Sequence, residues 1–327
     1  MTLSDVWKMT EFKPFLLCRF PGESELRRYC FNSVDCARNC LVFDEATIFP
    51  WPGVAVDKTM VSPVTSTEYD DYCSRLGFLI AKLKQTGGKT VITRQICGKF
   101  SRFNPEEMAL RYFAAFPDVF CFLFYHPFTG WWMGASPELL LQSHSANELH
   151  TRALAGTRSA SKNGDWDDKN IEEHAFVTDD ILNRIKNATH DSVSVSMSRR
   201  NLSYGKIEHL CTDITIASPD SIDETAIIRA IHPTPAVGGY PREEAMENIE
   251  LFEPSSRNCY GGRITIKTAE GITSYVILRC VHFDTERWAI YTGSGITSSS
   301  IPKDEWIETE EKASPLISLL SKYSQNE

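Results

Sequence analysis

Residues 263–292 read RITIKTAEGITSYVILRCVHFDTERWAIYT, and three extended runs joined by short turns fill this stretch. The runs cover residues 263–267, 274–282 and 288–292, and the last two are rich in the β-branched and aromatic side chains that favour strands. Similar runs recur along the chain in groups, and helical segments separate the groups without a regular strand–helix–strand alternation. This pattern predicts an α+β fold with a large antiparallel sheet core and flanking helices.

Capping residues and apolar spacing locate the other elements. Apolar side chains at helical spacing follow Tyr69, and Asn104 followed by Pro105 is typical of a helix start. We expect helices at 69–84, from 104, at 165–186, at 223–231, from 241 and from 300. We expect further strands within 14–60 and at 89–94, 119–125, 131–142, 149–154, 193–197 and 207–216.

Composition excludes several classes of function. The chain has 327 residues, 42% of them hydrophobic, and a formal net charge of −9. The negative charge argues against a general affinity for nucleic acid or for an anionic membrane surface. No apolar run reaches the roughly 18 residues of a membrane span, and residues 1–15 lack the apolar stretch of a secretory signal. We therefore expect a cytosolic protein, and a monomer because no long heptad pattern or exposed apolar stripe demands a partner.

Two segments rich in carboxylates flank a Pro/Gly loop in the sequence. Residues 170–174 read Asn-Ile-Glu-Glu-His, residues 232–239 read His-Pro-Thr-Pro-Ala-Val-Gly-Gly, and residues 305–312 read Glu-Trp-Ile-Glu-Thr-Glu-Glu-Lys. Glu305, Glu308 and Lys312 share one helical stripe. Taken alone, that stripe equally fits a solvated surface with a local ion pair. Glutamates from two helices that meet at one point would suit a hard divalent cation.

Isolated charged side chains and small residues indicate a binding site. Glu138 follows a proline inside an apolar stretch, where desolvation raises a carboxyl pKa as a general acid requires. Arg279 stands in an otherwise apolar run, where a ligand carboxylate would suit its guanidinium group. Residues 154–157 and 291–295 read as small-residue turns that let backbone N–H groups approach a ligand, although each also fits a simple tight bend.

The order of these segments resembles that of the chorismate-utilising enzymes, and among them the chain is most similar to the isochorismate synthases. The resemblance covers residues 85 to 320, and its agreement across all segments is far more specific than any single match. The segments that carry it are Lys89-Thr-Val-Ile-Thr-Arg94, Ala135-Ser-Pro-Glu138, Leu154-Ala-Gly-Thr157, Glu173-His174, His232-Pro-Thr-Pro-Ala236, Ile277-Leu-Arg279, Tyr291-Thr-Gly-Ser-Gly-Ile and Glu305 to Lys312.

The resemblance implies the aminodeoxychorismate synthase-like fold, chorismate as substrate, and Mg²⁺. One compact domain is expected, in which residues 1–84 complete the sheet core and residues 85–327 form the chorismate-binding catalytic region. Lys89 would activate the attacking water and Glu138 would protonate the departing hydroxyl. Glu173 and Glu308 would bind Mg²⁺ directly, and Glu305 would lie in the same site and act through water. The substrate contacts it implies are Ala155, Gly156, Thr157, His232, Arg279, Tyr291, Gly293, Ser294, Gly295 and Lys312.

One position departs from the family pattern, in which the helical segment usually reads Lys-Asp-x-x-Glu-His. Asn170 stands where the aspartate is usual, so one negative charge is missing from the surroundings of the metal. We expect Asn170 to orient a metal-bound water at most, and metal affinity to be weaker than in relatives.

Three functions remain open at this stage. The resemblance favours isochorismate synthase, because the ammonia-using branches, which work with a glutaminase, typically carry Gln or Ala where this chain has Lys89. No glutaminase subunit is therefore expected. A salicylate synthase, which also eliminates pyruvate, is the first alternative, and a non-catalytic chorismate-binding protein is the second. Whether the product would serve menaquinone, siderophore or salicylate synthesis depends on neighbouring enzymes.

Overall fold

The computed structural model describes residues 13–56, 65–161, 164–190, 192–204, 207–269 and 271–324. Sixteen strands in this part of the chain form one sheet, in the order β10-β11-β9-β8-β14-β13-β4-β3-β2-β1-β6-β7-β15-β16-β5-β12. All neighbours are antiparallel. The strands are β1 (Phe15–Arg19), β2 (Arg27–Asp35), β3 (Cys40–Phe43), β4 (Ala46–Phe49), β5 (Lys89–Lys99), β6 (Phe120–His126), β7 (Gly130–Ser136), β8 (Leu139–Ser145), β9 (Glu148–Ser159), β10 (Ser194–Tyr204), β11 (Ile207–Ala217), β12 (Gly239–Tyr240), β13 (Arg263–Thr268), β14 (Gly271–Val276), β15 (Cys280–Phe283) and β16 (Arg287–Ile296).

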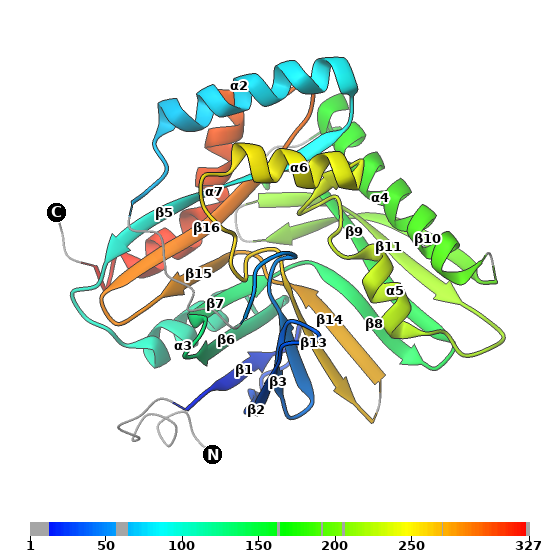
Figure 1. The fold of residues 1–327 in the computed structure, drawn as a ribbon, viewed down its shortest axis with the longest axis horizontal. Helices are drawn as coiled ribbons and strands as arrows, with labels where there is room; N and C mark the ends of the chain where they lie inside the picture. Colours follow the sequence, from blue (N-terminus) through cyan, green and yellow to red (C-terminus); the bar gives the residue numbers. More distant parts are fainter. Residues whose placement is uncertain are drawn as a thin grey trace.

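Six helices flank this sheet within the same residues (Figure 1). They are α2 (Tyr69–Thr86), α3 (Pro105–Ala115), α4 (Asp168–Thr189), α5 (Glu224–Ile231), α6 (Arg242–Phe252) and α7 (Pro302–Leu320). The prediction of an α+β fold with a large antiparallel sheet is confirmed. None of the helices in the described residues is long and apolar enough to cross a membrane.

Local sequence explains where the helices begin and which faces they bury. The side chain of Asn104 accepts a hydrogen bond from the N–H of Glu107 and caps α3, and Asp167 caps α4 in the same way. These caps satisfy backbone donors that the first helical turn leaves free. The apolar stripe of α2 is buried as its spacing predicts, at Tyr72, Leu76, Leu79, Ile80 and Leu83.

Strand β2 joins two halves of the sheet, because it pairs with β1 on one side and with β3 on the other. The first half runs in sheet order from β1 to β12, and the second half runs from β2 to β10. The strands of the N-terminal residues therefore lie in the middle of the sheet. In Figure 1 the first half occupies the left of the view and the second half the right.

The chain crosses between these halves at two breaks where the sequence predicts continuous strands. Residues 131–142 form β7 and β8, with residues 137–138 between them, and residues 274–282 form β14 and β15, with residues 277–279 between them. β7 pairs with β15 in the first half, and β8 pairs with β14 in the second. The two single-strand predictions are wrong because an apolar run that changes sheets has the same composition as one buried strand.

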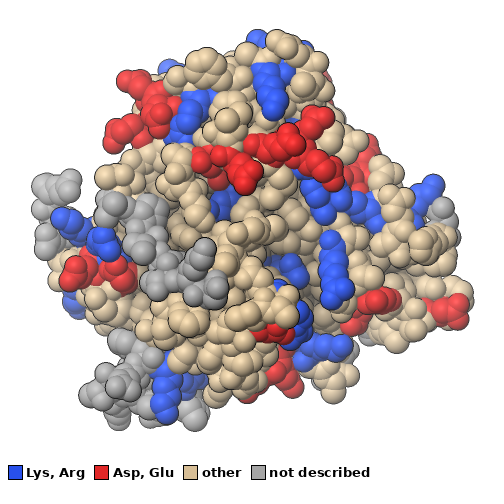
Figure 2. Space-filling view, viewed as in Figure 1, with Lys and Arg blue, Asp and Glu red and all other residues tan. Residues whose placement is uncertain are grey.

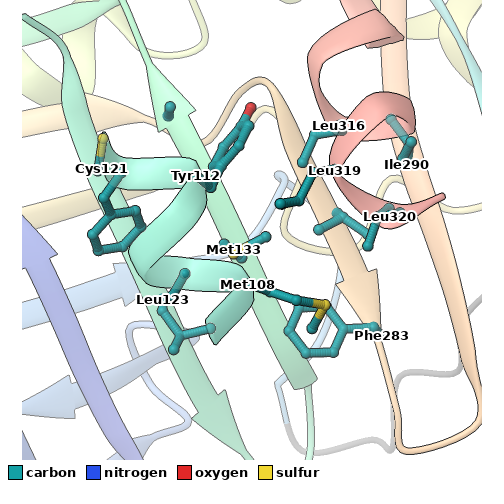
Figure 3. Close-up of a cluster of buried hydrophobic side chains, with 14 of the residues drawn as sticks. Met108, Tyr112, Cys121, Leu123, Met133, Phe283, Ile290, Leu316, Leu319 and Leu320 are labelled. Carbon is teal, nitrogen blue, oxygen red and sulfur yellow. The ribbon is translucent and has the colours of Figure 1, made fainter. Parts of the chain in front are cut away.

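Helices cover the outer faces of both halves. Figure 3 shows the cluster between α3, α7 and the sheet, in which Met108 of α3 lies close to Met133 of β7. On the second half, α4 and α5 bury Val177, Ile181 and other aliphatic side chains against the sheet. These layers hold the two breaks in fixed positions on the inner side.

Candidate active site

The two breaks place a carboxyl and a guanidinium side chain beside one cavity. Glu138 lies between β7 and β8, Arg279 lies between β14 and β15, and both line the cavity. Arg279 has a φ of 49°, in the left-handed region. The expectation that it continues an apolar strand is therefore corrected, because a left-handed residue interrupts strand alternation.

The side chain of Glu138 is almost completely buried. It is 1% exposed, and the hydroxyl of Thr234 donates to its Oε1 at 2.7 Å. Burial raises the pKa of Glu138 to about 7, although the Thr234 hydrogen bond and the charge of Lys89 oppose the shift. A carboxyl in this setting holds a proton near neutral pH, as a general acid must.

A buried histidine orients Arg279. Nη2 of Arg279 donates to Nε2 of His209 at 2.9 Å, which leaves the ring proton on Nδ1, 3.1 Å from the carbonyl oxygen of Gly156. Burial and the Arg279 charge lower the pKa of His209 well below its usual value, so the ring is neutral. The sequence analysis missed His209, although a lone histidine in the apolar run 207–216 was a signal.

Gly156 lies at a bulge, not in the predicted turn. It belongs to β9, where the register opposite His209 and Leu210 shifts by one residue. Its φ is +78°, and a Cβ there would come within 3.2 Å of the carbonyl oxygen of Asn170. Glycine fits this position for both reasons.

Asn170 holds the backbone of this bulge in place. Its Oδ1 accepts from the N–H of Thr157 at 2.9 Å, and its Nδ2 donates to Asp167 at 2.8 Å. An aspartate could make the first contact but not donate in the second. The amide at residue 170 therefore links the start of α4 to the cavity wall.

Lys89 and Glu173 form a buried ion pair between β5 and α4. Their Nζ and Oε1 atoms lie 2.9 Å apart, and their side chains are 1% and 8% exposed. Gly295 passes close by in β16, where a Cβ would lie 2.3 Å from Oε1 of Glu173 and 2.5 Å from Cε of Lys89. Residues 293–295 thus continue a strand instead of forming the predicted turn, and the missing side chain of Gly295 makes room for the pair.

Helix α7 presents its charged stripe to the interior of the protein. Glu305 is 1% exposed, and its Oε1 lies 2.8 Å from Nζ of Lys169 on α4. Glu308 lies 3.8 Å from Lys169 and 2.6 Å from Lys312. Nζ of Lys312 also donates to the carbonyl oxygen of Gly293 at 3.0 Å. The stripe is not a solvated surface.

The pKa values of the two α7 carboxylates, Glu305 and Glu308, shift in opposite directions. Burial raises the pKa of Glu305, and the neighbouring charge of Glu308 raises it further. Burial would also raise the pKa of Glu308, but the ammonium groups of Lys312 and Lys169 outweigh it and lower that pKa. Glu308 is therefore the better anionic ligand of the two.

The donor set around α4 and α7 suits magnesium by its chemistry. Among the described residues, no three His, Cys, Asp or Glu side chains converge closely enough to hold a metal by themselves. Mg²⁺ usually takes only one or two protein carboxylates, with water and substrate completing its shell. The oxygens of Glu173 and Glu308 fit that role, since each already faces the cationic group of a lysine.

The cavity gathers most of the predicted substrate contacts. Its volume is about 60 Å³. The predicted residues in its wall are Glu138, Ala155, Gly156, Thr157, Glu173, Arg279, Tyr291, Gly293, Ser294, Gly295 and Lys312.

Four other predicted residues lie behind the wall. Lys89 reaches the cavity through Glu173, and Glu305 and Glu308 adjoin it through Lys169 and Lys312. His232 was expected to line the ring pocket, but it is 6% exposed. Its Nε2 bonds the carbonyl oxygen of Gly261 at 3.0 Å, so in this structure it supports the loop that carries Thr234.

Comparison with known proteins identifies the family to which the chain belongs. The family model described as chorismate binding enzyme matches residues 57–318. The chain is 32% identical over 212 residues to isochorismate synthase MenF of Escherichia coli (strain K12), covering 61% of this chain and 48% of that protein. It is 28% identical over 198 residues to anthranilate synthase component 1 of Aquifex aeolicus, covering 57% and 40%. The chain thus spans about half the length of the curated relatives it matches.

Solved structures share the fold over nearly the whole chain. MenF, the menaquinone-specific isochorismate synthase from Escherichia coli, has a TM-score of 0.75 at 20% identity, covering 94% of this chain and 88% of that one. A putative 2,3-dihydroxybenzoate-specific isochorismate synthase, DhbC from Bacillus anthracis, has a TM-score of 0.70 at 20% identity, with 98% and 87% covered.

Proposed function

Because the chain belongs to the family of chorismate binding enzymes, we propose that it converts chorismate into isochorismate. In this reaction the oxygen of a water molecule adds to C2 of the ring, and the C4 hydroxyl leaves as water after taking up a proton. One water is consumed and one is released, so the reaction is an isomerisation. The names of two of its relatives, MenF from Haemophilus influenzae and from Escherichia coli, support this assignment.

One observation carries the proposal: Lys89 and Glu138 lie buried near the same cavity, and the charge of Lys89 acts on the pKa of Glu138. Glu138, with its raised pKa, would give its proton to the leaving C4 hydroxyl. Lys89, with its amine in the neutral form, would accept a proton from the attacking water and become an ammonium group. Two groups with these complementary roles are what water addition and hydroxyl loss require.

The cationic wall of the cavity would bind the two carboxylates of chorismate. Arg279 offers its guanidinium group, held by His209, and Tyr291 and the backbone of residues 293–295 lie beside it. Lys312 would hold the other end of the substrate. These contacts orient the ring between Lys89 and Glu138, which lowers the entropic part of the barrier.

Magnesium belongs to the proposal as the partner of Glu173 and Glu308, with Glu305 acting through water. When bound, Mg²⁺ would supply positive charge for a substrate carboxylate and help to fix its position. The lysines that pair with these glutamates, Lys89 and Lys312, would then have to give up part of their contacts.

A product assay tests the function directly. The purified chain is incubated with chorismate and Mg²⁺, and the products are separated by chromatography. Isochorismate as the single product supports the proposal. Salicylate with pyruvate would assign the chain to the salicylate synthases instead, and unchanged chorismate that still binds would leave a binding protein.

A further inference from the structure

A second cavity lies between α5, the turn at residues 37–39, and the strands β4, β13 and β14. Its volume is about 610 Å³, within the range of about 300–1,000 Å³ typical of small-molecule sites. It shares no lining residue with the central cavity. Figure 2 shows Lys and Arg side chains gathered over this hollow, between the positions of α5 and β13 in Figure 1. We call it the basic groove.

The lining of the basic groove carries an excess of positive charge. Its cationic members are Arg38, Arg229, Arg263 and Lys267, against one carboxylate, Glu45. Arg38 pairs with Asp35 outside the groove. None of the ion pairs found among the described residues includes Arg229, Arg263 or Lys267. Such a cluster is notable in a chain with a net charge of −9.

Arg263 lines the groove, and its guanidinium group stacks on an aromatic ring without an ion-pair partner among the described residues. Its guanidinium group stacks on the ring of Phe49 at 3.8 Å, and its Nε is buried without a hydrogen-bond partner. Burial lowers its pKa to about 10, and the like charge of Arg229 acts in the same direction. A partly buried cation without a counter-ion carries a desolvation cost, and an anion in the groove would offset that cost.

Part of the groove's lining is apolar. Phe49, Pro50, Pro52, Ile228 and Ile272 contribute this part. Together with the cationic side chains they fit a ligand that has a compact apolar body and more than one negative charge. We propose that the basic groove binds a small organic dianion, a carboxylate or a phosphate, and that its occupancy reaches the central cavity through Arg263.

The connection to the central cavity is short. Nη1 of Arg263 donates to Nδ1 of His232 at 3.3 Å. His232 precedes Thr234 by two residues, and the hydroxyl of Thr234 donates to Glu138. An anion that draws the guanidinium group toward the groove competes with the His232 contact. The position of the Thr234 loop therefore differs between the occupied and the empty groove. Coupling between two sites requires such a difference in contacts between the bound and the free state.

Binding is tested with phthalate and phenyl phosphate as dianionic probes and with benzyl alcohol as a neutral one, by calorimetry. The double variant Arg229→Gln/Lys267→Gln should lose at least about tenfold in affinity for the dianions, since it removes two charges from the rim. Both residues are exposed, so the fold should persist. The variant Lys84→Gln/Lys322→Gln, which removes two exposed charges elsewhere, should bind as the parent does.

Three binding results would overturn the proposal. They are equal losses in the two double variants, no binding to the parent chain at about 10 mM probe, and binding of benzyl alcohol as tight as that of phthalate. Arg279→Gln separates the two cavities: the probes should still bind this variant, and loss of binding there would place them in the central cavity. These binding tests do not depend on the proposed function. The better of the two dianions tells whether the natural ligand is a carboxylate or a phosphate.

Coupling is tested by turnover, and this part rests on the proposed function. With chorismate in excess, the better probe should change kcat of the parent and of Lys84→Gln/Lys322→Gln, but not of Arg229→Gln/Lys267→Gln. An effect that excess chorismate removes would show competition at the central cavity and end the coupling claim. An unchanged kcat with the groove occupied would end it too.

Discussion

Lys89 lies where solvent does not reach, with its Nζ 2.9 Å from a carboxylate oxygen of Glu173. A pair of this kind is worth little net stability, because the loss of hydration offsets the attraction between the charges. Its placement beside the central cavity therefore points to a chemical role. The same reasoning applies to Glu138, because burial raises the pKa of this carboxyl to about 7.

Lys89→Ala should lower the rate of isochorismate formation by about a hundredfold or more, since it removes the group that accepts a proton from water. Chorismate should still bind, because Arg279 and Lys312 remain. Product formation and calorimetric binding measure the two effects, with exposed Lys84→Ala as the control. Substantial residual turnover in a folded Lys89→Ala protein would exclude this lysine as the base.

The activity should fall as the pH rises above about 7, because Glu138 loses its proton there and can no longer act as an acid. Thr234→Val should move this fall to higher pH, since the lost hydrogen bond favours the ionised carboxyl. Thr234→Ser keeps the donor and should leave the fall unchanged. The profile of kcat/KM against pH provides the measurement, and identical profiles in all three proteins would contradict the role of Thr234.

At the scale of elements, the site is built from interruptions of strands and from glycine positions within strands. Glu138 and Arg279 stand at the two crossings between the halves of the sheet. Gly156 stands at a bulge, and Gly295 lets β16 pass against the Lys89 pair. Regular strands alternate their side chains, so side chains that must meet at one point come from such irregular positions.

Gly295→Ala should abolish activity, because its Cβ would overlap the positions of Glu173 Oε1 and Lys89 Cε. Gly77→Ala is the matched control: it lies in α2 with nothing within 4 Å of its new Cβ, and it should raise the free energy of unfolding by about 0.5–1 kcal/mol. Turnover and denaturant unfolding are measured for both. A fully active Gly295→Ala protein would show that the pair can shift without consequence.

At the scale of the whole molecule, the fold brings α4 and α7 together from distant parts of the sequence. Lys169 on α4 contacts both Glu305 and Glu308 on α7, and Glu173 lies on the same helix α4. The carboxylates that we propose for magnesium therefore exist as a group only in the folded protein. Metal binding should accordingly depend on an intact α4–α7 arrangement.

Glu308→Gln should raise the Mg²⁺ concentration needed for half-maximal activity by about tenfold or more, since an amide oxygen is a weaker ligand than a carboxylate. Glu311→Gln removes an exposed charge from the same helix and should leave the requirement unchanged. Magnesium titrations of turnover compare the two variants with the parent. Matching titration curves for Glu308→Gln and the parent would move the metal to other ligands.

The sequence by itself determined the class of fold, most helices and strands, and the family. Apolar spacing and caps act over a few residues, so α2, α3 and α5 follow from local sequence alone. Family resemblance also indicated the residues that line the cavity. The sequence could not distinguish a strand from a crossing at residues 137–138 and 277–279, because apolar residues continue on both sides of each crossing.

Only the tertiary structure decided how the charges are paired. Lys169 between two glutamates, His209 behind Arg279, and Asn170 beneath Gly156 are contacts between residues far apart in sequence or on different elements. No local pattern encodes such pairings, because burial and distance set their energies and both arise when the sheet and helices pack. The basic groove is likewise assembled from the turn at residues 37–39, β4, β13, β14 and α5, and the sequence alone gives no sign of it.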